Sequence, residues 1–183
     1  MPYGNHGKVL RVDLTAGEIT VETPGEAFYR RYLGGAGFVA YYLLTEVPPG
    51  TDPLGPGNRL VFACGPVTGA PLAGSGRNAI GALSPLTGAL GEAEVGGFWG
   101  VELKAAGFDA IVVHGQAVSP VYLWVHDGQA ELRPAAHLWG LENKEAHAAI
   151  RQELGQERAR IALCGPAGER RVRYAAIVAD LKH

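Results

Sequence analysis

The spacing of apolar and polar positions predicts a series of short elements. Residues 8–14 and 18–22 alternate around the turn 15–17, which is typical of a β-hairpin. The continuous apolar run 59–64 is typical of a buried strand. Asp127-Gly128, placed between two alternating segments, indicates a second hairpin. Further strands are predicted at 77–80, 89–94, 110–114, 121–126, 129–133, 160–163 and 174–178.

Helical periodicity occupies the remaining segments, at 27–31, 38–44, 98–106 and 142–154. Thr23, Pro24 and Glu26 together resemble a capping box with proline at the first helical position. The cluster Gly34–Gly37 interrupts the first helical pattern. Because a glycine inside a helix costs about 1 kcal/mol relative to alanine, we expect a break there and not one continuous helix.

The order of elements repeats within the chain. A strand, turn, strand, helix, strand and Cys-Gly-Pro succession occurs at 9–66 and again at 121–166. We therefore predict an α+β fold built from a duplicated unit, with two mostly antiparallel sheets, flanking helices and an approximate two-fold relation. Cys64 and Cys164 are then expected in equivalent buried positions. Chance similarity of two short units is the alternative.

Length and composition point to one globular domain covering residues 1–183. Hydrophobic residues make up 47% and charged residues 19%, which excludes a disordered chain. The net charge of −2 and the absence of a basic run argue against nucleic acid as a partner. The sequence shows neither a signal peptide nor an apolar stretch of membrane-spanning length. Two cysteines cannot form a disulfide framework, so a cytoplasmic location is expected.

Two glycine-rich segments are the candidates for chemistry. The segments 74–78 and 96–100 combine potentially free backbone N–H groups with the guanidinium of Arg77, an arrangement that suits a phosphate. Neither segment fits the dinucleotide fingerprint or the P-loop pattern. The histidines and cysteines lack metal-ligand spacing. The simpler interpretation is that the glycines form turns and that Arg77 pairs with an acidic neighbour.

Taken together, the motifs resemble one family across essentially the whole chain. They stand in a fixed order at 3–8, 13–15, 32–35, 65–69, 84–88, 96–111 and 165–169. This set is similar to the N-terminal domain of the tungsten-containing aldehyde:ferredoxin oxidoreductase family.

The resemblance implies a cofactor and a set of contacts. Members of the family hold tungsten, sometimes molybdenum, between two pterins beside a 4Fe–4S cluster, oxidise aldehydes to carboxylic acids and pass electrons to ferredoxin. The N-terminal domain is the base on which the pterins lie. Arg77 matches an arginine that contacts a pterin phosphate. Glu94, Gly96 and Gly97 match an Asn-x-Gly-Gly stretch, whose asparagine also helps to hold a magnesium ion between the phosphates.

Three departures from the family pattern modify this expectation. Glu94 replaces the asparagine, so its carboxylate should repel a phosphate unless a cation is bound. Ala36 stands where relatives commonly have arginine. The sequence stops at His183, before the second pterin loop, the cluster cysteines and the proton-transfer residues of the family.

We therefore expect this chain to have no catalytic residues of its own and, by itself, to hold no tungsten, molybdenum or iron–sulfur cluster. Its expected partner is the remainder of the oxidoreductase or a second polypeptide, with ferredoxin serving the complete enzyme. An open pterin-facing surface favours a homo-oligomer. The alternative is a stand-alone scaffold or binding protein, or the product of a truncated gene. The reading frame downstream distinguishes these possibilities.

Overall fold

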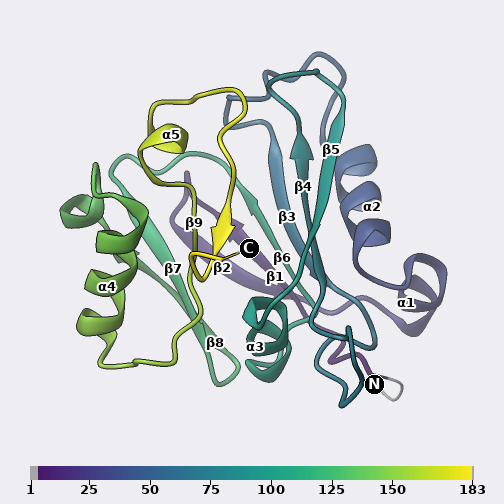
Figure 1. Cartoon of the computed structure of the whole chain (residues 1–183). Coiled ribbons are helices and arrows are strands. Elements are labelled where there is room, and N and C mark those ends of the chain that lie inside the picture. Colours follow the sequence, from purple (N-terminus) through teal and green to yellow (C-terminus); the bar gives the residue numbers. More distant parts are fainter. Residues whose placement is uncertain (1–3, 183) are drawn as a thin grey trace.

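The computed structural model describes residues 4–182, so Tyr3 of the first motif and His183 lie outside the described residues. A six-stranded sheet runs through the centre of the molecule in the order β2-β1-β6-β3-β4-β5 (Figure 1). Its strands are β1 (Val9–Asp13), β2 (Glu18–Glu22), β3 (Arg59–Cys64), β4 (Asn78–Leu83), β5 (Leu90–Val95) and β6 (Ala110–His114). The β1–β6 pair is parallel and the other pairs of this sheet are antiparallel.

Helices α1 (Glu26–Tyr32) and α2 (Ala36–Glu46) cover one face of the sheet (Figure 1). Because side chains alternate along a strand, every second residue of the central strands points toward these helices. The resulting core contains Val9, Tyr29, Phe38, Val39, Tyr42, Leu43, Val61, Ala63, Ala79, Ala110 and Val112.

The opposite face packs against α3 (Trp99–Ala105) and a hairpin of β7 (Val121–His126) and β8 (Gln129–Pro134). The buried centre of this second core comprises Leu10, Val12, Cys64, Leu103, Phe108 and Ile111. A third, smaller core lies farther out, between this hairpin, the 3-10 helix η1 (Ala136–Leu138) and α4 (Asn143–Leu154). The layers therefore follow one another from α2, through the sheet and the hairpin, to α4 (Figure 1).

The break predicted in the first helical pattern is confirmed, and it has a tertiary cause. Gly34 adopts φ 121°, and a Cβ there would overlap the carbonyl oxygen of Cys64. The N–H of Gly35 donates to the same oxygen at 3.1 Å. The chain thus turns between α1 and α2 while touching the end of β3. The predicted capping box is wrong, because α1 begins after Gly25 and not after Thr23.

The buried carboxylate of Asp109 ties the N-terminal segment to the core. It accepts hydrogen bonds from the N–H groups of His6, Gly7 and Lys8, and from the hydroxyl of Tyr29 at 2.9 Å. The ammonium of Lys104 lies 2.7 Å away. Burial by itself raises the pKa of Asp109, but the hydrogen bond from Lys104 and the backbone donors outweigh it, so the pKa lies below its ordinary value.

The expected α+β character and the mostly antiparallel pairing are found, but the duplication is not confirmed. The first predicted unit supplies three strands of the central sheet, β1, β2 and β3, and the other three lie between the two units. In the second unit, β7 and β8 form a sheet of their own, and β9 (Ala162–Leu163) pairs with β10 (Val178–Ala179). The strands predicted at 160–163 and 174–178 are therefore reduced to one short two-stranded ribbon. In the sequence, α5 (Gly165–Glu169) lies between its two strands.

The predicted equivalence of the two cysteines is wrong. Cys64 ends a central strand between two packed layers, is 1% exposed and donates its thiol to the carbonyl oxygen of Gly100. Cys164 follows the two-residue β9 and is exposed. Cys64 packs between the central sheet and α3, whereas Cys164 directly precedes the short helix α5. None of the helices described in residues 4–182 has the length and apolar character needed to cross a bilayer.

Candidate anion-binding site

Two glycine-rich segments meet at the end of the sheet where β4 begins and β5 ends. The first is the connection 65–77, and the second comprises Gly96, Gly97 and Phe98. A Cβ on Gly76 would overlap the carbonyl oxygen of Gly97, so the two backbones are in direct contact. The sequence singled out both segments separately, and the fold brings them together.

A threonine holds the first segment in shape. The hydroxyl of Thr68 accepts a hydrogen bond from the N–H of Gly65 at 2.9 Å and donates to the carbonyl oxygen of Arg77 at 2.8 Å. The side chain of Thr68 is nearly buried. The hydroxyl of Thr68 therefore fixes the backbone at Arg77, next to the contact of Gly76 with Gly97, while the side chain of Arg77 is exposed.

The guanidinium of Arg77 pairs with the carboxylate of Glu94 at 3.5 Å. Antiparallel pairing of Ala79 with Glu94 places the two charged residues at the same end of neighbouring strands. Their side chains are 64% and 56% exposed. An exposed ion pair of this kind stabilises a fold by about 0.2–1 kcal/mol, so a phosphate can displace the carboxylate at little cost. In this structure Arg77 thus pairs with an acidic neighbour, as the simpler interpretation of the sequence predicts. Because the pair is weak, the guanidinium remains available for a ligand.

The helix after the second segment is close to its predicted bounds. The pattern predicted 98–106, and α3 spans Trp99–Ala105. Gly97 has φ 90°, which lets the chain turn sharply into the helix. With only seven residues, α3 contributes local N–H groups and not the field of a long helix.

Asn78 is the last residue of the candidate segment 74–78, but the sequence predicted no role for its side chain. It follows Arg77, begins β4 and is only 2% exposed. Within residues 4–182, neither its Nδ2 nor its Oδ1 has a hydrogen-bond partner. The available signal was an amide side chain at the start of a strand that is otherwise apolar, which is too common to identify a site by itself.

A magnesium ion would find one protein carboxylate here, that of Glu94. No group of three or more His, Cys, Asp or Glu residues capable of holding a metal occurs in the described part of the chain. Magnesium commonly binds through one or two carboxylates together with phosphate oxygens and water. The residues present therefore fit a phosphate that arrives with its cation, and they do not form a metal site alone.

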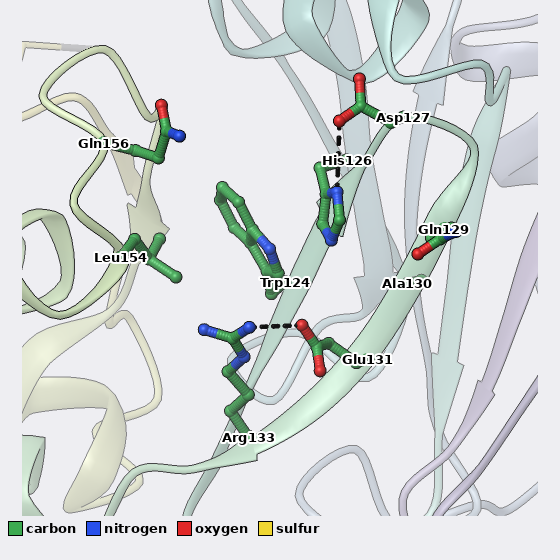
Figure 2. Close-up of a pocket in the computed structure, with 9 residues that line it drawn as sticks. All are labelled: Trp124, His126, Asp127, Gln129, Ala130, Glu131, Arg133, Leu154 and Gln156. Atoms are coloured by element: carbon green, nitrogen blue, oxygen red, sulfur yellow. Dashed lines mark hydrogen bonds and ion pairs between the residues drawn. The ribbon is translucent and has the colours of Figure 1, made fainter.

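A separate groove of about 570 Å³ lies between the β7–β8 hairpin and the end of α4 (Figure 2). Trp124 and His126 line its wall with their rings 5.1 Å apart. Arg133 forms an ion pair with Glu131 in the groove, and the imidazole Nδ1 of His126 lies 3.4 Å from the carboxylate of Asp127 (Figure 2). None of these residues belongs to the predicted site.

The fold and this site define an α+β domain that presents one arginine beside two touching glycine-rich segments. Comparison with known sequences identifies its family. The family model of the aldehyde ferredoxin oxidoreductase N-terminal domain matches residues 9–183, and the chain belongs to this family.

Several relatives are similar over nearly the whole chain. The tungsten-containing aldehyde ferredoxin oxidoreductase of Pyrococcus furiosus is 47% identical across 97% of this chain. The enzyme of the same name from Thermococcus kodakarensis is also 47% identical across 97%. The WOR-like subunit of an aliphatic sulfonate oxidoreductase from Pyrococcus furiosus is 34% identical across 99%.

A solved structure has the same fold. It is the active-site complex BamBC of benzoyl-coenzyme A reductase with 1,5-dienoyl-CoA, which aligns with 98% of this chain at a TM-score of 0.94 and 40% identity. The chain spans 29% of the length of the two aldehyde ferredoxin oxidoreductases and 27% of the matched chain of the reductase.

Proposed function

We propose that this chain is the domain of an aldehyde:ferredoxin oxidoreductase-like enzyme that binds the phosphate of a tungsten or molybdenum pterin. One observation carries the proposal. Arg77, whose exposed guanidinium pairs with Glu94, directly follows Gly76, and Gly76 contacts Gly97; the family resemblance expects a pterin phosphate at these positions. The similarity to tungsten-containing relatives supports the choice of cofactor.

Arg77 would bind the phosphate through two parallel N–H donors, a geometry that a guanidinium provides and an ammonium does not. For this, Arg77 must leave Glu94. The released carboxylate would otherwise repel the phosphate, so it would turn toward a magnesium ion held on the phosphate oxygens. The backbone N–H groups of Gly96 and Gly97 would complete the contacts around the anion.

The chemistry of the complete enzyme requires more than this chain. When bound, the metal–pterin group supplies the redox chemistry that converts an aldehyde to a carboxylic acid. In this proposal the chain binds and orients the pterin, and has no catalytic residues itself. The remainder of the oxidoreductase would carry the 4Fe–4S cluster and pass electrons to ferredoxin. Exposed apolar side chains near the site, those of Val67, Leu72 and Phe98, offer this remainder a surface to cover.

The test is a titration of the chain with magnesium pyrophosphate, followed by NMR. We expect the amide signals of Arg77, Gly96 and Gly97 to shift together. Arg77→Ala should weaken binding at least about tenfold, the effect of losing one charge-assisted hydrogen bond.

A matched control comes from Arg30, which forms a similarly exposed ion pair with Glu26 on α1. Arg30→Ala should leave the affinity unchanged. Equal binding by wild type and Arg77→Ala would refute the proposal.

A further inference from the structure

The buried amide of Asn78 is the least satisfied polar group near the candidate site. Asn78 is 2% exposed. In the part of the chain that the structure describes, neither its Nδ2 nor its Oδ1 has a hydrogen-bond partner. Buried polar groups in folded proteins are nearly always paired, because an unpaired one has lost its bonds to water without replacement. An apolar side chain of similar size would fill the same space without this cost.

Asn78 packs against the first turn of α3. It sits between its strand partners Cys64 and Val95, on the sheet face that α3 covers. A Cβ on Gly100 would come within 2.8 Å of the Oδ1 of Asn78, so only a glycine allows this approach. The first N–H groups of any α-helix lack an acceptor within the helix. An unpaired acceptor and helix N–H groups in need of one therefore lie next to each other.

A second asparagine, Asn58 at the opposite end of the β3–β4 pair, shows what a purely structural amide looks like in this sheet. The Nδ2 of Asn58 donates to the carbonyl oxygens of Pro53 and Leu83. Its Oδ1 accepts from the N–H groups of Arg59 and Leu83. All of these bonds are formed without a ligand, in contrast to those of Asn78.

We propose that Asn78 is a positioning residue for the anion site, whose amide oxygen accepts a first-turn N–H of α3 when a phosphate binds. The inference rests on the proposed function. Asn78 follows Arg77 directly in the chain, and its amide lies against Gly100 in the first turn of α3, so it connects the two parts of the site. This hydrogen bond fixes the first turn of α3 against the sheet. The preceding residues Gly96 and Gly97 then keep their N–H groups directed at the anion. The unpaired amide of the free chain is the cost of this arrangement.

The proposal predicts opposite effects on stability and binding. Asn78→Leu should raise the melting temperature of the free chain or leave it unchanged, since it removes an unpaired buried amide. The same change should weaken binding of magnesium pyrophosphate by about fivefold to tenfold, the worth of one net hydrogen bond. The matched control Asn58→Leu should lower the melting temperature and leave the affinity of the folded chain unchanged.

The outcomes separate this inference from the proposed function. If wild type does not bind magnesium pyrophosphate, the proposed function fails and the role of Asn78 fails with it. If wild type binds and Asn78→Leu binds equally well, only the role of Asn78 is refuted. Should Asn78→Leu not fold, the side-chain amide signal of Asn78 and the N–H signal of Gly100 in the wild type decide. Both should shift on binding, and unmoved signals would overturn the inference.

Discussion

Glu94 stands in two roles at the candidate site, as partner of Arg77 and as the expected ligand of magnesium. In the free chain its carboxylate lies 3.5 Å from the guanidinium. An incoming phosphate must therefore compete with a group of the same charge. Magnesium changes this competition because a divalent cation attracts both anions.

Glu94→Gln should strengthen binding of pyrophosphate in the absence of magnesium. The neutral amide no longer competes for Arg77 or repels the anion, and a gain of about threefold to tenfold is expected from removing one exposed like charge. The added effect of magnesium should shrink. Calorimetric titration with and without magnesium measures both quantities.

Glu92→Gln is the matched control, because Glu92 lies two residues earlier on the same exposed strand. This change should have little effect on either titration. If Glu94→Gln binds more weakly than wild type without magnesium, the carboxylate is not the competitor we describe.

At the scale of elements, the site depends on contact between two backbones. Gly76 belongs to the connection from β3 to β4, and Gly97 to the turn from β5 into α3. Because each segment leaves the same end of a neighbouring strand, the β4–β5 register brings them together. The absence of a Cβ on Gly76 allows them to touch.

Gly76→Ala should therefore separate the two segments. An added methyl group that meets a backbone carbonyl forces the chain to shift, and we expect a loss of about 1–3 kcal/mol in the free energy of unfolding. Gly96→Ala is the control, because its Cβ would have open space. It should change the stability by less than about 0.5 kcal/mol. Equal urea-denaturation midpoints for the two variants would contradict this packing.

At the scale of the whole molecule, one carboxylate links four parts of the chain. Asp109 joins the N-terminal segment, α1 through Tyr29, α3 through Lys104 and the start of β6. Since its pKa is lowered in the folded state, the unfolded chain takes up the proton first as the pH falls. The stabilisation is complete well above an unfolded pKa of about 3.9 and is lost as the pH falls through that value toward the folded pKa.

Asp109→Asn should lower the free energy of unfolding at pH 7 by about 3–5 kcal/mol, because Lys104 remains buried without its counter-charge. The variant should also lose less stability than wild type between pH 6 and pH 3. Urea denaturation across this range measures both effects.

The exposed Asp127 offers a control, since Asp127→Asn keeps a residue suited to the positive φ of 45° in the β7–β8 turn. This control should keep the acid dependence of wild type. An Asp109→Asn variant with the same dependence as wild type would show that Asp109 does not carry it.

The amino-acid sequence by itself determined most of the elements and the members of the site. Alternation and turn residues located the β1–β2 hairpin, and the glycine cluster located the break between α1 and α2. These features depend on neighbours within a few residues, which a sequence pattern records. Family motifs picked out Arg77, Glu94, Gly96 and Gly97, which the structure brings to one end of the sheet, although their role toward a pterin stays a prediction.

Only the tertiary structure decided how distant segments pair. Strand β1 pairs in parallel with β6, with Val9 opposite Ala110, and no local sequence pattern encodes this pairing. The same long-range packing buried Cys64 under α3 and left Cys164 exposed, although each is the first residue of a Cys-Gly-Pro segment. It also placed the amide of Asn78 against Gly100. Burial and unmet hydrogen bonds are properties of the assembled layers, and a residue's own sequence neighbours do not determine them.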